Sequence, residues 1–93
     1  MAQLNISKVY YVTDIYCDKS VNEHWLFKPH FAGQTDKTEH VGCISVENGN
    51  VVWKNFRGGR IAPNHELVEF REATPEETKI YEDSLEAHLH NQY

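Results

Sequence analysis

Hydrophobic and polar residues alternate along the first third of the chain. From Ile6 to Cys17, one set of alternate positions includes Val9, Tyr11 and Ile15, and the positions between them include Lys8. β-branched and aromatic residues are frequent in this segment. A period of two with this composition is typical of a half-buried β-strand. The polar segment 18–23 that follows predicts a turn.

A second alternating segment runs from His24 to Phe31. Trp25 and Phe27 would share one face of this strand, with His24 on the opposite, polar face. Pro29 has no amide hydrogen to donate to a neighbouring strand, so the strand should lie at a sheet edge or end at this residue. Residues 32–40 are polar and predict a loop.

Asn48-Gly49 lies between two apolar segments and predicts a β-hairpin. The flanking strands would be Val41 to Glu47 and Val51 to Phe56, and Asn-Gly favours a type I′ turn. A three-residue turn that includes Asn50 would shift the register by one and turn one strand over. With the two-residue turn, one face would carry the pairs Val46–Val51 and Ile44–Trp53, and the other would carry Cys43, Lys54, Val41 and Phe56.

The end of the chain predicts a short strand and then a helix. The strand would span about Leu67 to Arg71. Thr74 is suited to the N-cap, Pro75 to the first helical position, and Glu77 completes a capping box. The helix would continue to about His88 and must pack on the sheet, because its apolar stripe is narrow. That stripe contains Tyr81, Leu85, His88 and Leu89, with Ile80 beside them.

These segments predict a single α+β domain over residues 1–93. Four or five mostly antiparallel strands would occupy about residues 6–71, with the helix at about 75–89 packed on them. The connections between strands are too short for parallel crossover units, and the sheet could curl into a small SH3-like barrel. A chain of 93 residues is long enough for one modest core.

Composition indicates an ordinary soluble domain. Hydrophobic residues make up 40% of the chain and charged residues 25%. No apolar run approaches the roughly 18–20 residues that cross a bilayer, and the N-terminal residues lack a secretory pattern. We therefore expect a cytoplasmic protein. Cys17 and Cys43 are expected to be free thiols, although one disulfide between them is the alternative.

Negative charge is concentrated at the end of the chain. The net charge is −5, which divides into +1 over residues 1–65 and −6 over residues 66–93. An acidic protein is poorly suited to coating nucleic acid non-specifically. The acidic face of the helix is either simply solvated or a second binding surface that mimics phosphate spacing and occupies a basic groove. Its carboxylates are Glu76, Glu77, Glu82, Asp83 and Glu86.

The stretch from Trp53 to Arg60 combines aromatic and cationic residues around a di-glycine. Stacking rings beside cations suit single-stranded nucleic acid, and the same chemistry can contact acidic groups on a protein. The alternative is structural, with Trp53 in the core and Gly58-Gly59 as a chain reversal. The predicted contact residues are Trp53, Lys54, Phe56, Arg57 and Arg60.

No motif in the sequence predicts a cofactor, a metal site or a catalytic residue. The six histidines and two cysteines lack the paired spacing of a zinc site. A small enzyme would instead need distant histidines to converge with a carboxylate in one pocket. The histidines available for this are His24, His30, His40 and His65.

The segment Glu69 to Glu77, read Glu-Phe-Arg-Glu-Ala-Thr-Pro-Glu-Glu, resembles the strand-to-helix ending of small phage and prophage accessory proteins. The resemblance covers about a tenth of the chain and implies a compact β domain closed by a helix. No functional residue is implied by it.

Together these features predict a small non-enzymatic protein-binding regulator or inhibitor, similar to phage-encoded proteins that occupy a host protein. Two alternatives remain open: a nucleic-acid-binding module that uses the same aromatic and cationic stretch, and a small histidine-dependent enzyme. A homodimer is also compatible with the sequence, because an open sheet leaves strand edges that need covering.

Overall fold

The computed structural model describes residues 4–29, 40–41, 43–54, 60–61 and 67–90, and the predictions that concern other residues lie outside this part of the chain. Its elements, in chain order, are β1 (Tyr10–Asp14), the 3-10 turn η1 (Lys19–Val21), β2 (His24–Phe27), β3 (His40–Val41), β4 (Ile44–Glu47), β5 (Asn50–Lys54), β6 (Arg60–Ile61), β7 (Leu67–Glu72) and α1 (Pro75–His90).

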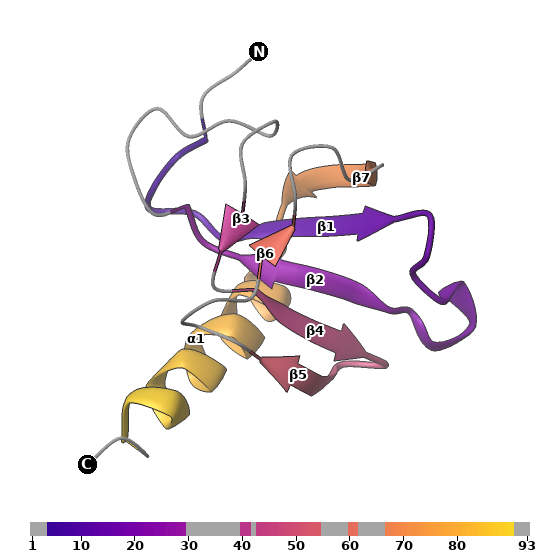
Figure 1. Cartoon of the computed structure of the whole chain (residues 1–93). Coiled ribbons are helices and arrows are strands. Elements are labelled where there is room, and N and C mark those ends of the chain that lie inside the picture. The colour runs from indigo at the N-terminus through magenta and orange to yellow at the C-terminus, as the bar shows by residue number, and fades with distance from the viewer. Residues whose placement is uncertain (1–3, 30–39, 42, 55–59, 62–66, 91–93) are drawn as a thin grey trace.

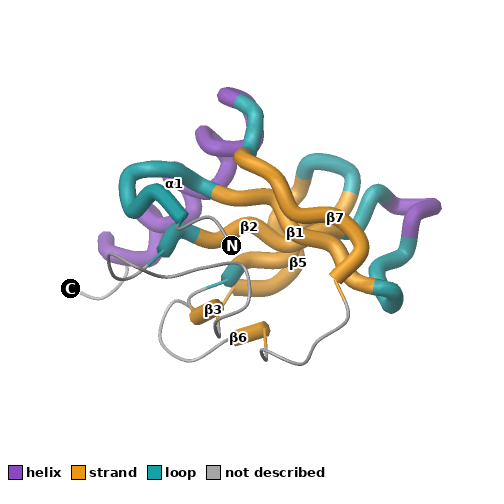
Figure 2. The backbone as a smooth tube through the Cα atoms, turned by 90° about the horizontal axis from the view of Figure 1, so that it is seen from above, coloured by secondary structure: helices purple, strands orange, loops and turns teal. Residues whose placement is uncertain are grey.

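Five strands form an open antiparallel sheet in the order β5-β4-β2-β1-β7, and β3 pairs with β6 separately. Figures 1 and 2 show α1 against one side of the sheet and the β3–β6 pair on the other. The predicted α+β class with a C-terminal helix is therefore confirmed. Further curling into an SH3-like barrel stays a prediction.

Both faces of the sheet are buried at its centre. The core beneath α1 contains Val9, Tyr11, Leu26, Ile44, Val46 and Tyr81, and the core on the opposite face contains Tyr10, Val12, Phe27 and Cys43. The expectation of a half-buried first strand is wrong, because consecutive residues of β1 point into two different cores. A strand buried on both sides does not need the polar alternation of a strand that faces water.

The first two strands are shorter than the sequence pattern suggested. β1 ends at Asp14, whose carboxylate accepts a hydrogen bond from the Tyr16 amide at 2.9 Å, so Ile15 lies exposed in a turn. Pro29 predicted that this strand would either lie at a sheet edge or end there. β2 does end before Pro29, but it is a central strand of the sheet. His24 lies beneath α1 and is buried, not on a polar face.

The hairpin forms with the predicted two-residue turn. Asn48 and Gly49 both have positive φ, 52° and 80°, and Glu47 pairs with Asn50. Positive φ at both central residues is the signature of a type I′ turn, which matches the twist of the flanking strands. The Asn48 amide also donates to the Val21 carbonyl at 2.8 Å, which ties the hairpin to η1.

Beyond the turn, the register departs from prediction at a β-bulge. Val46 faces Val51 as expected, but Val52 is an extra residue, so Trp53 pairs with Ser45 and Lys54 with Ile44. The bulge therefore exchanges the two faces, because one inserted residue reverses the side on which every following side chain lies. The predicted strand from Val41 is also wrong: Val41 belongs to β3, and β4 begins at Ile44.

Replacing Gly49 by alanine should lower the free energy of unfolding by about 1 kcal/mol, because alanine is strained at a φ of 80°. The added methyl group would meet no atom within 4 Å, so backbone strain is the only expected cost. Denaturant unfolding of the variant measures this. Asn48→Gly is the matched control and should lose nothing, and an equal loss in both variants would contradict the type I′ assignment.

The strand-to-helix junction contains the predicted capping box. The Thr74 amide donates to Glu77 Oε1 at 2.8 Å, and the Glu77 amide donates to Thr74 Oγ1 at 3.2 Å. Glu77 was also expected on the solvated acidic face, which is wrong: it is half-buried and receives two hydrogen bonds from the Arg71 guanidinium, at 3.0 and 3.2 Å. The same guanidinium lies 3.8 Å from the centre of the Tyr11 ring.

The buried stripe of α1 differs from the predicted one at two positions. Tyr81 is buried and Ile80 and Leu85 pack against the core beneath the helix, as expected. Ser84 is also buried, which the apolar pattern did not indicate, whereas Leu89 is exposed near the end of the helix.

Candidate functional site

The outer strand β5 exposes three consecutive apolar residues. The exposed fractions are 36% for Val51, 53% for Val52 and 48% for Trp53, and Lys54 beside them is exposed too. These residues lie at one edge of the main sheet, with β4 as their only strand neighbour among the described residues. A half-exposed tryptophan at the edge of a sheet is typical of a surface that meets another molecule.

The bulge at Val52 places Trp53 in this exposed position. Without it, Trp53 would lie opposite Ile44, on the face that α1 covers. With it, the indole lies beyond Ser45 and Trp25 on the other face, at the outer margin of the sheet. The structural alternative, in which Trp53 is a core residue, is therefore wrong.

The structure brings together only part of the predicted aromatic and cationic stretch. Trp53 and Lys54 are neighbours at the exposed end of β5. The backbone of Arg60 belongs to β6, outside the main sheet. Phe56 and Arg57 lie outside the described residues.

The predicted acidic face of α1 is exposed but partly neutralised. Lys79 pairs with Asp83 at 2.7 Å, and His90 lies 3.7 Å from Glu86. These are surface pairs that contribute little to stability. The exposed carboxylates that remain as a second predicted contact surface are Glu76, Glu82, Asp83 and Glu86.

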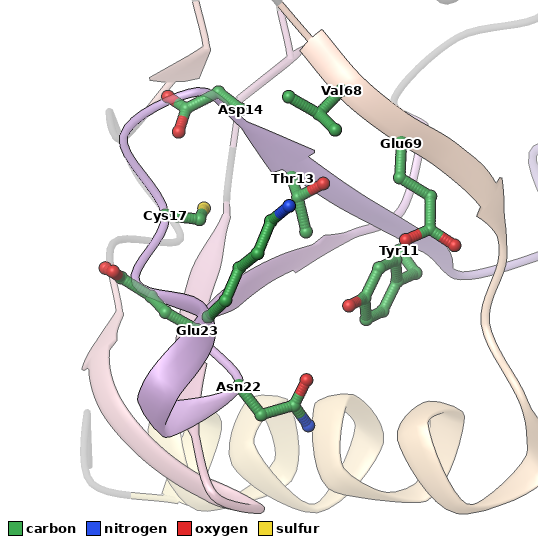
Figure 3. A pocket seen from close by; sticks show the side chains of 9 residues that line it. Tyr11, Thr13, Asp14, Cys17, Asn22, Glu23, Val68 and Glu69 are labelled. Carbon is green, nitrogen blue, oxygen red and sulfur yellow. The ribbon is translucent and has the colours of Figure 1, made fainter.

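A small pocket that the sequence did not predict lies where β1, β7 and the turn around η1 meet (Figure 3). Its volume is about 230 Å³. It forms because Asp14 and Asp18 fold the chain through two tight turns, and Asn22 then adopts a left-handed φ of 51° before β2 begins. The residues that line it are Tyr11, Thr13, Asp14, Cys17, Lys19, Asn22, Glu23, Val68 and Glu69.

Cys17 in this pocket is not an activated nucleophile. Burial, together with the nearby Asp14 and Glu23 carboxylates, raises the pKa of the Cys17 thiol to about 11. A thiol must be deprotonated to attack an electrophile, so Cys17 stays in its unreactive form at neutral pH. Cys17 and Cys43 are both free, as expected, and Cys43 is buried in the core.

The histidines that an enzyme would use are not seen to converge. His24 is 3% exposed, stacks on the Tyr11 ring at 4.5 Å, and its Nδ1 donates to the Asn22 carbonyl at 2.8 Å. Its Nε2 is buried without a hydrogen-bond partner. His40 lies in β3, and His30 and His65 are outside the described residues. Within the part of the chain that is described, no three metal-binding side chains gather.

Among the described residues, no helix has both the length and the apolar composition needed to span a membrane.

Comparisons with protein-family models, with curated proteins and with solved structures found no match to this chain. The resemblance of the Glu69 to Glu77 segment to phage accessory proteins therefore stays a prediction.

Proposed function

We propose that this chain is a small protein-binding domain whose contact surface is centred on Trp53 and Lys54 of β5. The observation that supports this is the half-exposed Trp53 side chain at the β5 edge of the sheet, in a run of three exposed apolar residues from Val51 to Trp53. Tryptophan is strongly enriched among the residues that dominate binding energy at interfaces. Contact with a partner removes the large apolar surface of its ring from water.

The chemistry of this surface defines the partner that fits it. The indole of Trp53 would enter an apolar depression, and the ammonium group of Lys54 would meet a carboxylate at its rim. Recognition would use side chains, because the bulge at Val52 interrupts the regular row of backbone groups that an added strand requires. The exposed carboxylates of α1 are a second surface for a basic region of the same partner.

We extend this proposal to a cytoplasmic regulator or inhibitor that acts by occupying its partner, in the manner of small phage-encoded proteins. The absence of an activated thiol from the described pocket and the exposed patch on β5 favour a binding role over catalysis.

Trp53→Ala should reduce partner binding by about 30-fold or more and leave stability within about 0.5 kcal/mol, because the side chain is half exposed. The partner is first captured in a pull-down with the tagged wild-type protein. The affinity of the captured partner for the wild type and for the variant is then measured. Leu89→Ala is the matched control, since Leu89 is equally exposed at 48% but lies on α1. A partner retained equally by Trp53→Ala and Leu89→Ala would overturn the proposal.

The same pull-down distinguishes the nucleic-acid alternative when it is repeated with nuclease and at raised salt. A protein partner held through Trp53 survives nuclease. If the bound material is instead lost on nuclease treatment, and its affinity falls steeply with salt, the surface around Trp53 binds single-stranded nucleic acid.

A further inference from the structure

The pocket at the β1–β7 end of the sheet is lined by hydrogen-bond donors from two elements and the loop beside them. Tyr11 and Thr13 come from β1, Lys19 from η1, and Asn22 from the residue that follows η1. The side-chain polar groups of these four residues form no hydrogen bond with any group in the described part of the chain. Polar groups without partners around a small cavity are suited to binding a polar ligand.

Tyr11 is held rigidly in place as one of these donors. Its ring is fixed by the Arg71 guanidinium at 3.8 Å and by the stacked His24 ring at 4.5 Å. Burial, and next the nearby Glu69 carboxylate, raise the pKa of Tyr11, so its hydroxyl stays protonated at neutral pH. Figure 3 shows this hydroxyl pointing toward the middle of the pocket.

Two of the three carboxylates in the lining are turned away from the cavity. Asp14 accepts from the Tyr16 amide and Glu23 from the Asp18 amide, and both carboxylates point outward in Figure 3. Glu69 remains beside Tyr11. One of its oxygens accepts from Arg71 Nε at 3.2 Å, and the other forms no hydrogen bond within the described residues.

We infer that this pocket binds a small zwitterion, a free α-amino acid, whose carboxylate meets Lys19 and the Tyr11 and Thr13 hydroxyls and whose ammonium group meets Glu69. A simple anion would be repelled by the Glu69 carboxylate, and a simple cation would be repelled by Lys19 and leave the donors unpaired. A ligand that carries both charges satisfies both groups. The volume of about 230 Å³ is below that of pockets for drug-sized ligands and suits a molecule of this size.

The site is separate from the proposed binding surface, since β7 and β5 are opposite edges of the sheet. The test of this inference is a titration of the full chain with L-alanine, in which the backbone amide chemical shifts are monitored by NMR. Acetate and methylammonium are titrated in parallel as the two halves of the ligand. We expect saturable shifts around Thr13 and Asn22 at millimolar L-alanine, with weaker binding of either half.

Variants then assign the contacts. Lys19→Met should weaken alanine binding about tenfold, and Tyr11→Phe, which keeps the stacked ring, about threefold. Lys79→Met is the matched control, because it removes an exposed lysine outside this pocket, and it should bind as the wild type does. The inference is overturned if alanine gives no saturable shift, if acetate binds as tightly as alanine, or if Lys19→Met binds as tightly as Lys79→Met.

Discussion

Phe27→Ala should lower the free energy of unfolding by about 3–5 kcal/mol, a large part of the stability of a domain of this size. Phe27 has no exposed surface and lies in the core on the face of the sheet opposite α1. Its ring centre is 5.9 Å from that of Tyr10 and 5.9 Å from that of Phe70. Truncation removes the buried ring and leaves a cavity whose walls cannot fully collapse, because Tyr10 and Phe70 are fixed in β1 and β7 of the same sheet.

Denaturant unfolding followed by tryptophan fluorescence or circular dichroism measures this loss. Two controls set the scale. Phe27→Leu keeps most of the volume and should lose roughly 1–2 kcal/mol. Tyr16→Ala removes an aromatic ring that is 77% exposed and should lose less than about 0.5 kcal/mol. A loss below about 1 kcal/mol for Phe27→Ala would mean that this second core is not closely packed.

Glu77→Ala should lower the free energy of unfolding by about 2–3 kcal/mol, which is the largest expected loss after that of Phe27→Ala. The substitution removes the capping box at the start of α1, worth about 1 kcal/mol, and leaves the partly buried Arg71 guanidinium without its main acceptor. Glu77→Gln is the matched control, because glutamine can still accept from the Thr74 amide. It should lose only the charged part of the contact with Arg71, about 1 kcal/mol.

The contribution of Glu77 should also depend on pH. Burial alone would raise the pKa of Glu77, but hydrogen bonds from Arg71 and from the Thr74 amide hold it below its usual value of 4.5. A carboxyl group with a lowered pKa in the folded state stabilises that state above its unfolded pKa and ceases to do so as the pH falls through the folded value. Stability should therefore fall more steeply below about pH 4.5 in the wild type than in Glu77→Gln. Equal slopes for the two proteins would contradict the ion pair.

The elements that local sequence could specify were predicted well. Asn48-Gly49 specified its own turn, since two consecutive positive φ angles are accessible to few residue pairs. Thr74, Pro75 and Glu77 specified the start of α1, because a capping box depends only on residues within one helical turn.

Features that depend on how the strands pair in the folded sheet could not be predicted. The extra residue Val52 lies in a run of β-branched residues that looks continuous in sequence, so nothing there marks the bulge that exposes Trp53. Val68 is a similar extra residue in β7, opposite the end of β1. The pocket was missed for the same reason, because its residues come from β1, η1 and β7, which meet only in the folded sheet.

The position of β1 affects how fast the chain can fold. β1 is hydrogen-bonded to β2, which follows it closely in the sequence, and to β7, which is reached only after all the other strands have been synthesised. The β4–β5 hairpin and the β1–β2 pair close short loops, whereas pairing β1 with β7 closes a loop of more than half the chain. Non-local pairing of this kind slows folding, so the rate-limiting step should be the arrival of β7 and its attached helix, which complete both cores.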